Sequence, residues 1–225
     1  MDPNTEYYSQ NARSFFDSTA SVDMSGLHEA FLSRLSVNAH ILDAGCGSGR
    51  DAKAFADRGF KVSAFDASPE LASLASQHCS FDVGVRTFGD VAEVDAYDGI
   101  WCCASLLHVP ATELPACLIR LWRALRPGGC LYVSFKLGTG EREHQGRRFT
   151  DADDTTLRHW LSPLTLVSSV ETWVSEDRRP DRSEQWINAL VAKAPAAQRK
   201  LVTGGDDPFL PHLSQAMARA TEIDI

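Results

Sequence analysis

The stretch HILDAGCGSGR, residues 40–50, decides the fold of this 225-residue chain. A short apolar run ends in Asp43 and passes directly into glycines at every second position, Gly45, Gly47 and Gly49. Glycine adopts positive φ without strain and lets a ligand approach the backbone, while the helix that follows presents unpaired N–H groups. Open α/β sheets bind ligands at the carboxyl ends of their strands, so the stretch predicts a ligand site there. The alternative is a tight strand-to-helix turn without a ligand.

The spacing of the glycines and the acid before them indicate the kind of ligand. Dinucleotide enzymes use G-x-G-x-x-G, whereas here the third glycine comes one residue earlier. Asp43, two residues before the first glycine, would repel a pyrophosphate but would pair with an ammonium group. The pattern therefore predicts a ligand with an amine and disfavours a nicotinamide-dependent oxidoreductase.

Outward from this stretch, short apolar runs alternate with longer segments of helical period, which is typical of a parallel sheet with crossover helices. The last two runs are close enough in sequence to form an antiparallel hairpin at one edge. The fold class predicted is therefore α/β, a doubly wound sheet of seven strands with helices on both faces. The expected strands are residues 39–43, 61–66, 84–88, 98–104, 129–135, 165–174 and 185–192.

Helix signals fall between these runs. Ser68 followed by Pro69 is typical of an N-cap with proline at the first helical position. Leucines recur at helical spacing from Leu114 to Leu125, and the Arg-Pro-Gly-Gly of residues 126–129 is expected to stop that helix. The expected helices are residues 12–18, 26–35, 68–79, 114–125 and 153–161.

Two further acids follow at the ends of successive strands. Asp66, 23 residues after Asp43, is placed to accept hydrogen bonds from a ribose. Asp90, after the third strand, could accept one from an exocyclic amine on an adenine ring. Each acid alone is as typical of an N-cap or a solvated loop, but together with the glycine turn they predict one pocket.

These motifs in order resemble the class I S-adenosylmethionine-dependent methyltransferases. LDAGCGSGRDA is followed by FDASPEL, GD, YDGIWCCASLLHV and LRPGGCLYVSFK, and the resemblance covers about residues 5–193. Within that superfamily the chain is most similar to small bacterial enzymes of the tellurite-resistance type. The resemblance implies a last strand antiparallel to the rest and S-adenosylmethionine as cofactor, with S-adenosylhomocysteine as product.

The resemblance also implies which residues bind the cofactor. Those expected at its methionine end are Asp43, Gly45, Cys46, Gly47 and Arg50. Those expected at its ribose and adenine are Asp66, Ala67, Ser68, Asp90 and Val91, and those on the reaction side are Cys103, Ala104 and Ser105. Methyl transfer from a sulfonium is an in-line displacement that requires no metal, so no metal ligands are expected.

The acceptor side is harder to predict. By resemblance, Tyr7 or Tyr8 closes over the cofactor, although aromatic residues near a chain start also serve in plain packing. His108, just beyond the fourth strand, is a candidate general base, and a purely structural histidine is the alternative. Tyr8 and His108 are therefore the candidate catalytic residues.

A polar, glycine-rich stretch, LGTGEREHQGRRF, follows the fifth strand and is predicted to be a loop at the acceptor wall. Four cationic or titratable side chains lie close together in it: Arg142, His144, Arg147 and Arg148. The arginines would suit an anionic acceptor such as a small carboxylate or phosphate, or Glu141 and Glu143 could neutralise them in a solvated loop. A second charged segment, SEDRRPDRSEQ from Ser175, is expected to be an exposed hairpin.

Composition limits the partners. With a formal net charge of −8, the chain is not expected to bind nucleic acid directly, and the longest apolar run, residues 100–109, is too short to span a membrane. The start MDPNTEYYSQ has neither a basic leader nor an apolar stretch, so a cytoplasmic location is expected. None of the six cysteines forms a C-x-x-C pair, so free thiols are expected. A cysteine nucleophile at Cys102 or Cys103 is a weaker alternative. We expect a small-molecule acceptor.

The end of the chain predicts a further domain. Residues 1–36 are expected to form a helical lid, 37–193 the methyltransferase core, and 194–225 a linker with the start of an incomplete domain. Residues 201–225 resemble the opening of phospholipase D-like nuclease domains that lie beside helicase modules, which predicts a fused nuclease or helicase-type partner domain. The alternative function is a non-catalytic cofactor-binding or regulatory module of a larger, nucleic-acid-processing protein.

Overall fold

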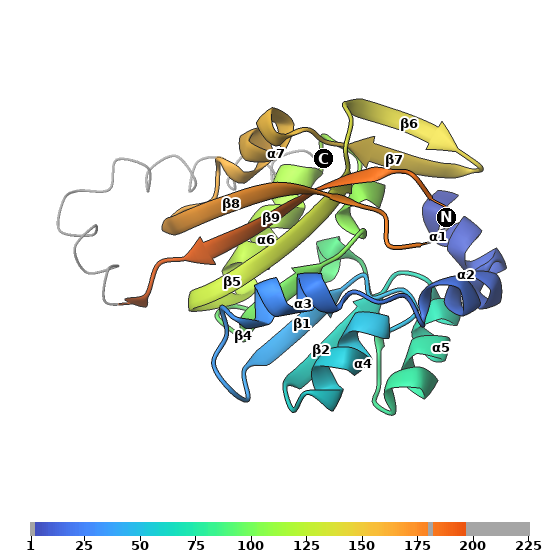
Figure 1. Ribbon diagram of the computed structural model, residues 1–225, viewed down its shortest axis with the longest axis horizontal. Helices are drawn as coiled ribbons and strands as arrows, with labels where there is room; N and C mark the ends of the chain where they lie inside the picture. Colours follow the sequence, from blue (N-terminus) through green and yellow to red (C-terminus); the bar gives the residue numbers. More distant parts are fainter. Residues whose placement is uncertain (1–2, 180–181, 197–225) are drawn as a thin grey trace, which may run out of the picture. The chain divides into compact units, whose positions relative to one another are not determined.

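The described residues build one large sheet with helices on both of its faces. A computed structural model of the chain describes residues 3–179 and 182–196 (Figure 1). Its seven-stranded sheet has the order β3-β2-β1-β4-β5-β9-β8, in which β9 runs antiparallel to both of its neighbours. The strands are β1 (His40–Ala44), β2 (Lys61–Asp66), β3 (Gly84–Val85), β4 (Tyr97–Cys102), β5 (Leu125–Lys136), β8 (Val167–Glu176) and β9 (Gln185–Lys193). The predicted fold class is confirmed.

Alternating side chains divide the core into two layers, as the two-residue period of a strand requires. Leu42 and Ile100 belong to the layer that contains the apolar side of α6, whereas Ile41, Trp101 and Tyr132 pack with the aromatic residues of α3 and α4. The helices are α1 (Pro3–Gln10), α2 (Ala12–Thr19), α3 (Ser25–Leu32), α4 (Arg50–Asp57), α5 (Pro69–Cys79), α6 (Leu114–Ala124) and α7 (Asp154–Leu161).

Some predicted boundaries are wrong for local reasons. The third strand ends at Val85, because Thr87 and Asp90 cap a short 3-10 helix, Phe88–Asp90, instead of extending the strand. Residues 126–129, predicted only to stop α6, already belong to β5, which begins at Leu125 directly after the helix. Helix α1 was not predicted, since its mean hydropathy is low and its apolar residues lack a helical period.

The stretch predicted as a polar loop is instead a second sheet of two strands, β6 (Gly140–His144) and β7 (Arg147–Asp151). Its connection, Gln145-Gly146, has positive φ at both residues (52° and 74°), which is the geometry of a tight two-residue hairpin turn. Helix α1 contacts both α5 and β7. The chain start and the hairpin are therefore neighbours beside the carboxyl ends of the parallel strands (Figure 1).

The compact unit that contains the sheet ends at Ala194. Residues 201–225, which resemble a nuclease domain, lie outside the described residues, so the predicted partner domain and the predicted division of the chain stay predictions. All six cysteines are free. Among the described residues, no helix is long and apolar enough to cross a membrane.

Candidate functional site

The turn between β1 and α4 has no room for a side chain at its three glycine positions. Gly45, Gly47 and Gly49 all have positive φ, of 74°, 56° and 74°. A Cβ on Gly45 would lie 2.6 Å from Cβ of Ser105, and one on Gly47 would lie 3.0 Å from the ring of Phe15. Both glycines line the cavities described below, so the turn offers bare backbone to whatever fills them.

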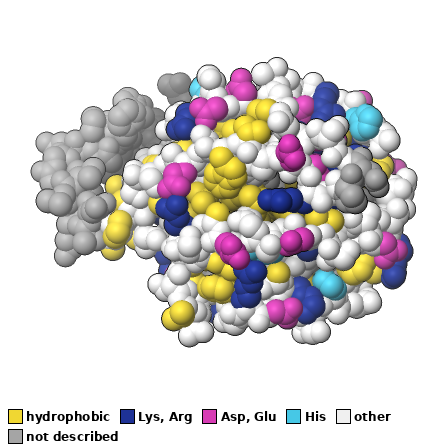
Figure 2. Space-filling view, viewed as in Figure 1, with side chains coloured by type: hydrophobic (Ala, Val, Ile, Leu, Met, Phe, Trp, Pro, Cys, Tyr) yellow, Lys and Arg dark blue, Asp and Glu magenta, His cyan; other side chains and the backbone are white. Residues whose placement is uncertain are grey.

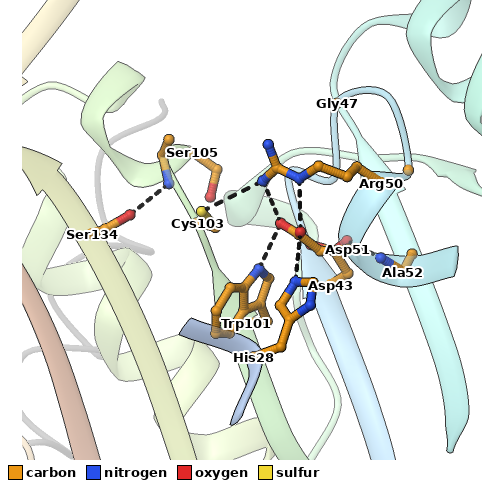
Figure 3. Close-up of polar contacts among 12 residues, drawn as sticks. His28, Asp43, Gly47, Arg50, Asp51, Ala52, Trp101, Cys103, Ser105 and Ser134 are labelled. Atoms are coloured by element: carbon orange, nitrogen blue, oxygen red, sulfur yellow. Dashed lines mark hydrogen bonds and ion pairs between the residues drawn. The ribbon is translucent and has the colours of Figure 1, made fainter. Parts of the chain in front are cut away.

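Asp43 ends the strand with a buried carboxylate. The side chain of Asp43 accepts a hydrogen bond from the backbone N–H of Ala52, 3.0 Å away (Figure 3). Asp43 as a whole is only 2% exposed. Burial raises the pKa of Asp43 well above its usual range, and the nearby charge of Asp51 raises it further. A cation bound at this carboxylate would favour its ionised form.

Beside it, a buried network holds Arg50 in place. Nε and one terminal nitrogen of Arg50 donate to the two oxygens of Asp51 at 2.8 and 2.7 Å. Asp51 is also 2.8 Å from Nε2 of His28 and accepts from the indole N–H of Trp101 at 2.9 Å (Figure 3). Burial by itself would raise the pKa of Asp51, but the charge and hydrogen bonds of Arg50 and the bond to His28 outweigh it and lower the pKa.

Sequence reasoning predicted Arg50 but missed His28, Asp51 and Trp101. Only Asp51 left a local signal, an acid in the first turn of the helix after the glycines. Arg50 also reaches to 3.8 Å from Sγ of Cys103, at the end of β4. The network fixes the guanidinium near the Asp43 carboxylate, so the two side chains together could bind a group that carries both a carboxylate and an ammonium.

Asp66 is the last residue of β2, and its side chain points toward the glycine turn that follows β1. Its carboxylate accepts hydrogen bonds from the backbone N–H groups of Gly47 and Ser68, each at 2.9 Å. Burial raises the pKa of Asp66, and those N–H groups oppose part of the rise. Asp66, Ala67 and Ser68 line a cavity of about 520 Å³ together with the rings of Phe65 and Phe88.

Asp90 and Val91 do not line that cavity. The Asp90 carboxylate accepts from the N–H and the hydroxyl of Thr87, both at 2.8 Å, and so caps its own short helix, while Val91 is buried in the core. Arg86, Thr87 and Gly89 line the cavity instead. The adenine role of Asp90 and Val91 stays a prediction that this arrangement of side chains does not favour.

The residues directly after β4 line the cavity beside Asp66 and a second, smaller cavity described below. Ala104 has a φ of 51° and donates its N–H to the hydroxyl of Ser134 at 2.8 Å, and Ser105 donates to the carbonyl of Ala44 at 2.8 Å. Burial raises the pKa of Cys103 to about 12, so its thiol stays protonated at neutral pH. A thiolate nucleophile at this position is therefore disfavoured.

A second cavity of about 160 Å³ adjoins the first, and both are lined by Tyr8, Ala104 and His108. The Tyr8 hydroxyl lies 2.8 Å from Nε2 of His108, while Nδ1 of His108 lies 2.9 Å from the carbonyl of Arg148. A carbonyl only accepts, so in the neutral ring Nδ1 carries the proton and Nε2 accepts from Tyr8. Burial raises the pKa of Tyr8, and the neighbouring Arg147 opposes part of that rise.

The other predicted acceptor-side residues divide between the cavities. His144 and Arg147 line the smaller one and Arg148 the larger, whereas Tyr7 lines neither and packs edge-on against Tyr8.

The segment after Ser175 joins the antiparallel strands β8 and β9, and Glu176, Arg178 and Arg182 are exposed, as predicted. Residues 175–179 and Arg182 also line the smaller cavity. The bend between β8 and β9 thus brings these residues to the same cavity as Asp43 and Arg50. No local sequence pattern indicates this contact.

Two comparisons of sequence support a methyltransferase. Residues 41–129 match the family described as a methyltransferase domain. The chain is 31% identical over 129 residues to a malonyl-[acyl-carrier protein] O-methyltransferase of Serratia marcescens, which covers 56% of this chain and 49% of that protein. It is 36% identical over 104 residues to a ubiquinone biosynthesis O-methyltransferase of Xanthomonas oryzae pv. oryzae, covering 43% of this chain and 42% of that one. The chain thus spans about half the length of these relatives.

A solved structure shares the fold. The 1,6-didemethyltoxoflavin-N1-methyltransferase of Burkholderia thailandensis, crystallised with 1,6-didemethyltoxoflavin and S-adenosylhomocysteine, superimposes with a TM-score of 0.68 at 23% identity and covers 84% of this chain and 85% of its own. The strand order with its antiparallel last strand, the glycine turn and the family match all indicate the same kind of domain. Residues 41–129 form the core of a class I S-adenosylmethionine-dependent methyltransferase domain.

Proposed function

We propose that this chain binds S-adenosylmethionine and transfers its methyl group to an oxygen of a small-molecule acceptor. The observation that carries the proposal is that the larger cavity, beside Asp66, and the smaller one, beside Asp43 and Arg50, meet at Tyr8 and His108. A cofactor that spans the two cavities would bring its reactive end to this pair.

The residues present fit the cofactor group by group. Asp43 would hold the ammonium, Arg50 the carboxylate and Asp66 the ribose hydroxyls, while Phe65 and Phe88 line the cavity where the adenine would lie. When bound, S-adenosylmethionine supplies an electrophilic methyl group on a sulfonium. The chain itself supplies alignment of the acceptor, and good alignment is worth roughly 7–11 kcal/mol of a barrier.

Tyr8 and His108 would carry away the proton of a hydroxyl acceptor. Tyr8 already donates to Nε2 of His108, so its oxygen can accept a hydrogen bond from the acceptor while its own proton passes to the imidazole. The carbonyl of Arg148 holds the opposite ring nitrogen and stabilises the imidazolium that forms. This arrangement, together with the two relatives named as O-methyltransferases, supports oxygen as the methylated atom.

The surface supports a small acceptor rather than a nucleic acid. Acidic and basic side chains are interspersed across the face drawn in Figure 2, and the formal net charge of the chain is −8. Duplex binding needs a continuous basic face. The cofactor would fill the side of the smaller cavity beside Asp43 and Arg50, which leaves the side lined by Tyr8, His108 and Arg147 for a compact acceptor.

Calorimetric titration with S-adenosylhomocysteine tests the cofactor site. Asp43→Asn and Asp66→Asn are expected to weaken binding by about 10-fold or more, since each removes a charged hydrogen-bond acceptor. Asp57→Asn, an exposed acid paired with Lys53 on α4, is the matched control and should leave binding unchanged. If the unaltered chain does not bind S-adenosylhomocysteine, the proposal fails.

Transfer of a radiolabelled methyl group from S-adenosylmethionine into a bacterial small-metabolite extract tests the activity. Labelled product that depends on Asp43 is the expected result. Cofactor binding without any labelled product, across extracts and purified hydroxy acids, would favour the non-catalytic module instead.

A further inference from the structure

Arg147 occupies an unusual position in the smaller cavity. Its guanidinium carbon lies 4.5 Å from the ring centroid of Tyr7, 5.1 Å from that of Phe149 and 6.0 Å from that of Tyr8. One terminal nitrogen donates to the side chain of Gln145 at 3.2 Å. Aromatic faces stabilise a cation and orient it, but they do not neutralise its charge.

The other cations around this cavity are paired with carboxylates or exposed to water. Arg50 pairs with Asp51 and Arg179 with Asp177, and Lys136 lies 2.7 Å from Glu184. Arg178 and Arg182 are exposed. Within residues 3–179 and 182–196, Arg147 has no carboxylate within ion-pair distance.

One polar atom of Arg147 is also unsatisfied. Its Nε is buried and, among the described residues, has no hydrogen-bond partner. A buried cationic N–H without an acceptor is costly, so such a group persists where a ligand provides the acceptor. Because the side chain lines the cavity, that ligand is the molecule that fills it.

Arg142, on the other strand of the same hairpin, is an arginine with a structural role and serves as a comparison for Arg147. Arg142 is directly opposite Phe149 in the β6–β7 register and lies over the same ring, with its guanidinium carbon 4.8 Å from the centroid. Its Nε donates to Asp151 at 2.6 Å, and the side chain does not line the cavity. Two arginines thus contact one ring, and only the one in the cavity lacks a carboxylate.

We propose that Arg147 binds an anionic group of the methyl acceptor, so that the acceptor is a small oxyacid, a carboxylate or a phosphate monoester, with a separate hydroxyl that lies at Tyr8. This inference rests on the proposed function, since it names the acceptor class of that same site. Arg147 then selects and orients the acceptor, while Tyr8 and His108 receive the proton.

Nuclear magnetic resonance of the arginine Nε–H groups tests this without the natural acceptor. The protein saturated with S-adenosylhomocysteine is titrated with sodium formate, with inorganic phosphate and with neutral formamide, and the Arg147 signal is assigned by its loss in Arg147→Gln. A saturable shift of the Arg147 signal with an anion, and none at Arg142, is expected, and the anion that binds more tightly identifies the oxyacid. No saturable shift with either anion, or an equal shift with formamide, overturns the inference.

Two variants separate this inference from the cofactor site. Arg147→Gln is expected to abolish the rise in melting temperature that the tighter anion produces in the unaltered protein, whereas Arg142→Gln retains it. Both variants should bind S-adenosylhomocysteine within about 2-fold of the unaltered protein, because neither side chain is assigned to the cofactor. A loss of about 10-fold or more in Arg147→Gln alone would place Arg147 at the cofactor carboxylate and overturn its assignment to the acceptor. If the unaltered chain binds no S-adenosylhomocysteine, it is the proposed function that fails, and titration of the free protein still tests Arg147.

Discussion

The hydroxyl of Tyr8 lies 2.8 Å from Nε2 of His108, although 100 residues separate the two along the chain. The contact exists because α1 packs against α5 and β7, where Asn4 donates to the carbonyls of His108 and Arg148 at 3.1 and 3.2 Å. Asn4 is itself buried. The chain start is therefore part of the site and holds the phenol in place.

Replacing Tyr8 by phenylalanine should lower the rate of methyl transfer by about 10²-fold or more while leaving S-adenosylhomocysteine affinity nearly unchanged, because only the proton path is lost. Initial rates are measured with the acceptor found in the radiolabel experiment. Tyr7→Phe, which keeps the neighbouring ring and removes a hydroxyl outside both cavities, is the control. Equal rates in the two variants would contradict a role for the Tyr8 hydroxyl.

Cofactor binding should depend on pH through Asp43. Since burial raises the pKa of this carboxyl in the free protein, it holds a proton below that pKa, and the cofactor ammonium must displace it. Affinity is therefore expected to rise with pH through this range and to level off above it, with a matching release of protons in calorimetry. Asp43→Asn should flatten the profile, and an unchanged slope in that variant would assign the dependence to another group.

Gly45→Ala should be more harmful than the same change at a glycine with free space around it. Gly59 also has positive φ, of 86°, but a Cβ there meets nothing within 4 Å. Gly59→Ala should therefore lower the free energy of unfolding by about 1 kcal/mol, the strain of the backbone alone. Gly45→Ala adds the clash with Ser105 and should cost roughly 2–4 kcal/mol and weaken cofactor binding. Urea denaturation of both variants makes the comparison, and equal losses would refute the clash.

Lys193 should contribute to the free energy of unfolding although it lines neither cavity. Its buried ammonium group donates to the carbonyls of Trp122 and Leu125 at 2.8 and 2.6 Å, at the end of α6. Lys193→Met leaves these carbonyls unsatisfied and should lower the free energy of unfolding by about 2–4 kcal/mol. Lys61→Met, at an exposed position, should change it by less than about 0.5 kcal/mol, as measured by urea denaturation.

The sequence predicted that the glycine turn and the neighbouring acids Asp43 and Asp66 lie together, because their signals are local. Asp43, Gly45 and Gly47 lie within five residues, and Asp66 ends the next strand, so strand pairing alone brings them together. The alternation of apolar runs likewise predicted the seven strands of the sheet. What local patterns could not show is how buried charges find one another, as with His28 and Asp51, which are 23 residues apart on different helices.

The acceptor side was only partly predictable for the same reason. His144 and Arg147 were expected near the acceptor, but the stretch was read as a loop because its alternating charges mask the period of a strand. Only the glycine at 146 signalled a turn. The difference between Arg142 and Arg147 depends on Asp151, a partner chosen by the register of the hairpin and not by its composition.

Of the three residues proposed to meet the acceptor, only His108 lies within residues 41–129, whereas Tyr8 belongs to α1 and Arg147 to the β6–β7 hairpin. The part that matches the family and the part that chooses the acceptor are thus separate stretches of polypeptide. Descendants of one ancestral gene could exchange or remodel the hairpin and keep the same methyl donor. In this architecture new chemistry can be acquired by insertion after the fifth strand, without redesign of the nucleotide end.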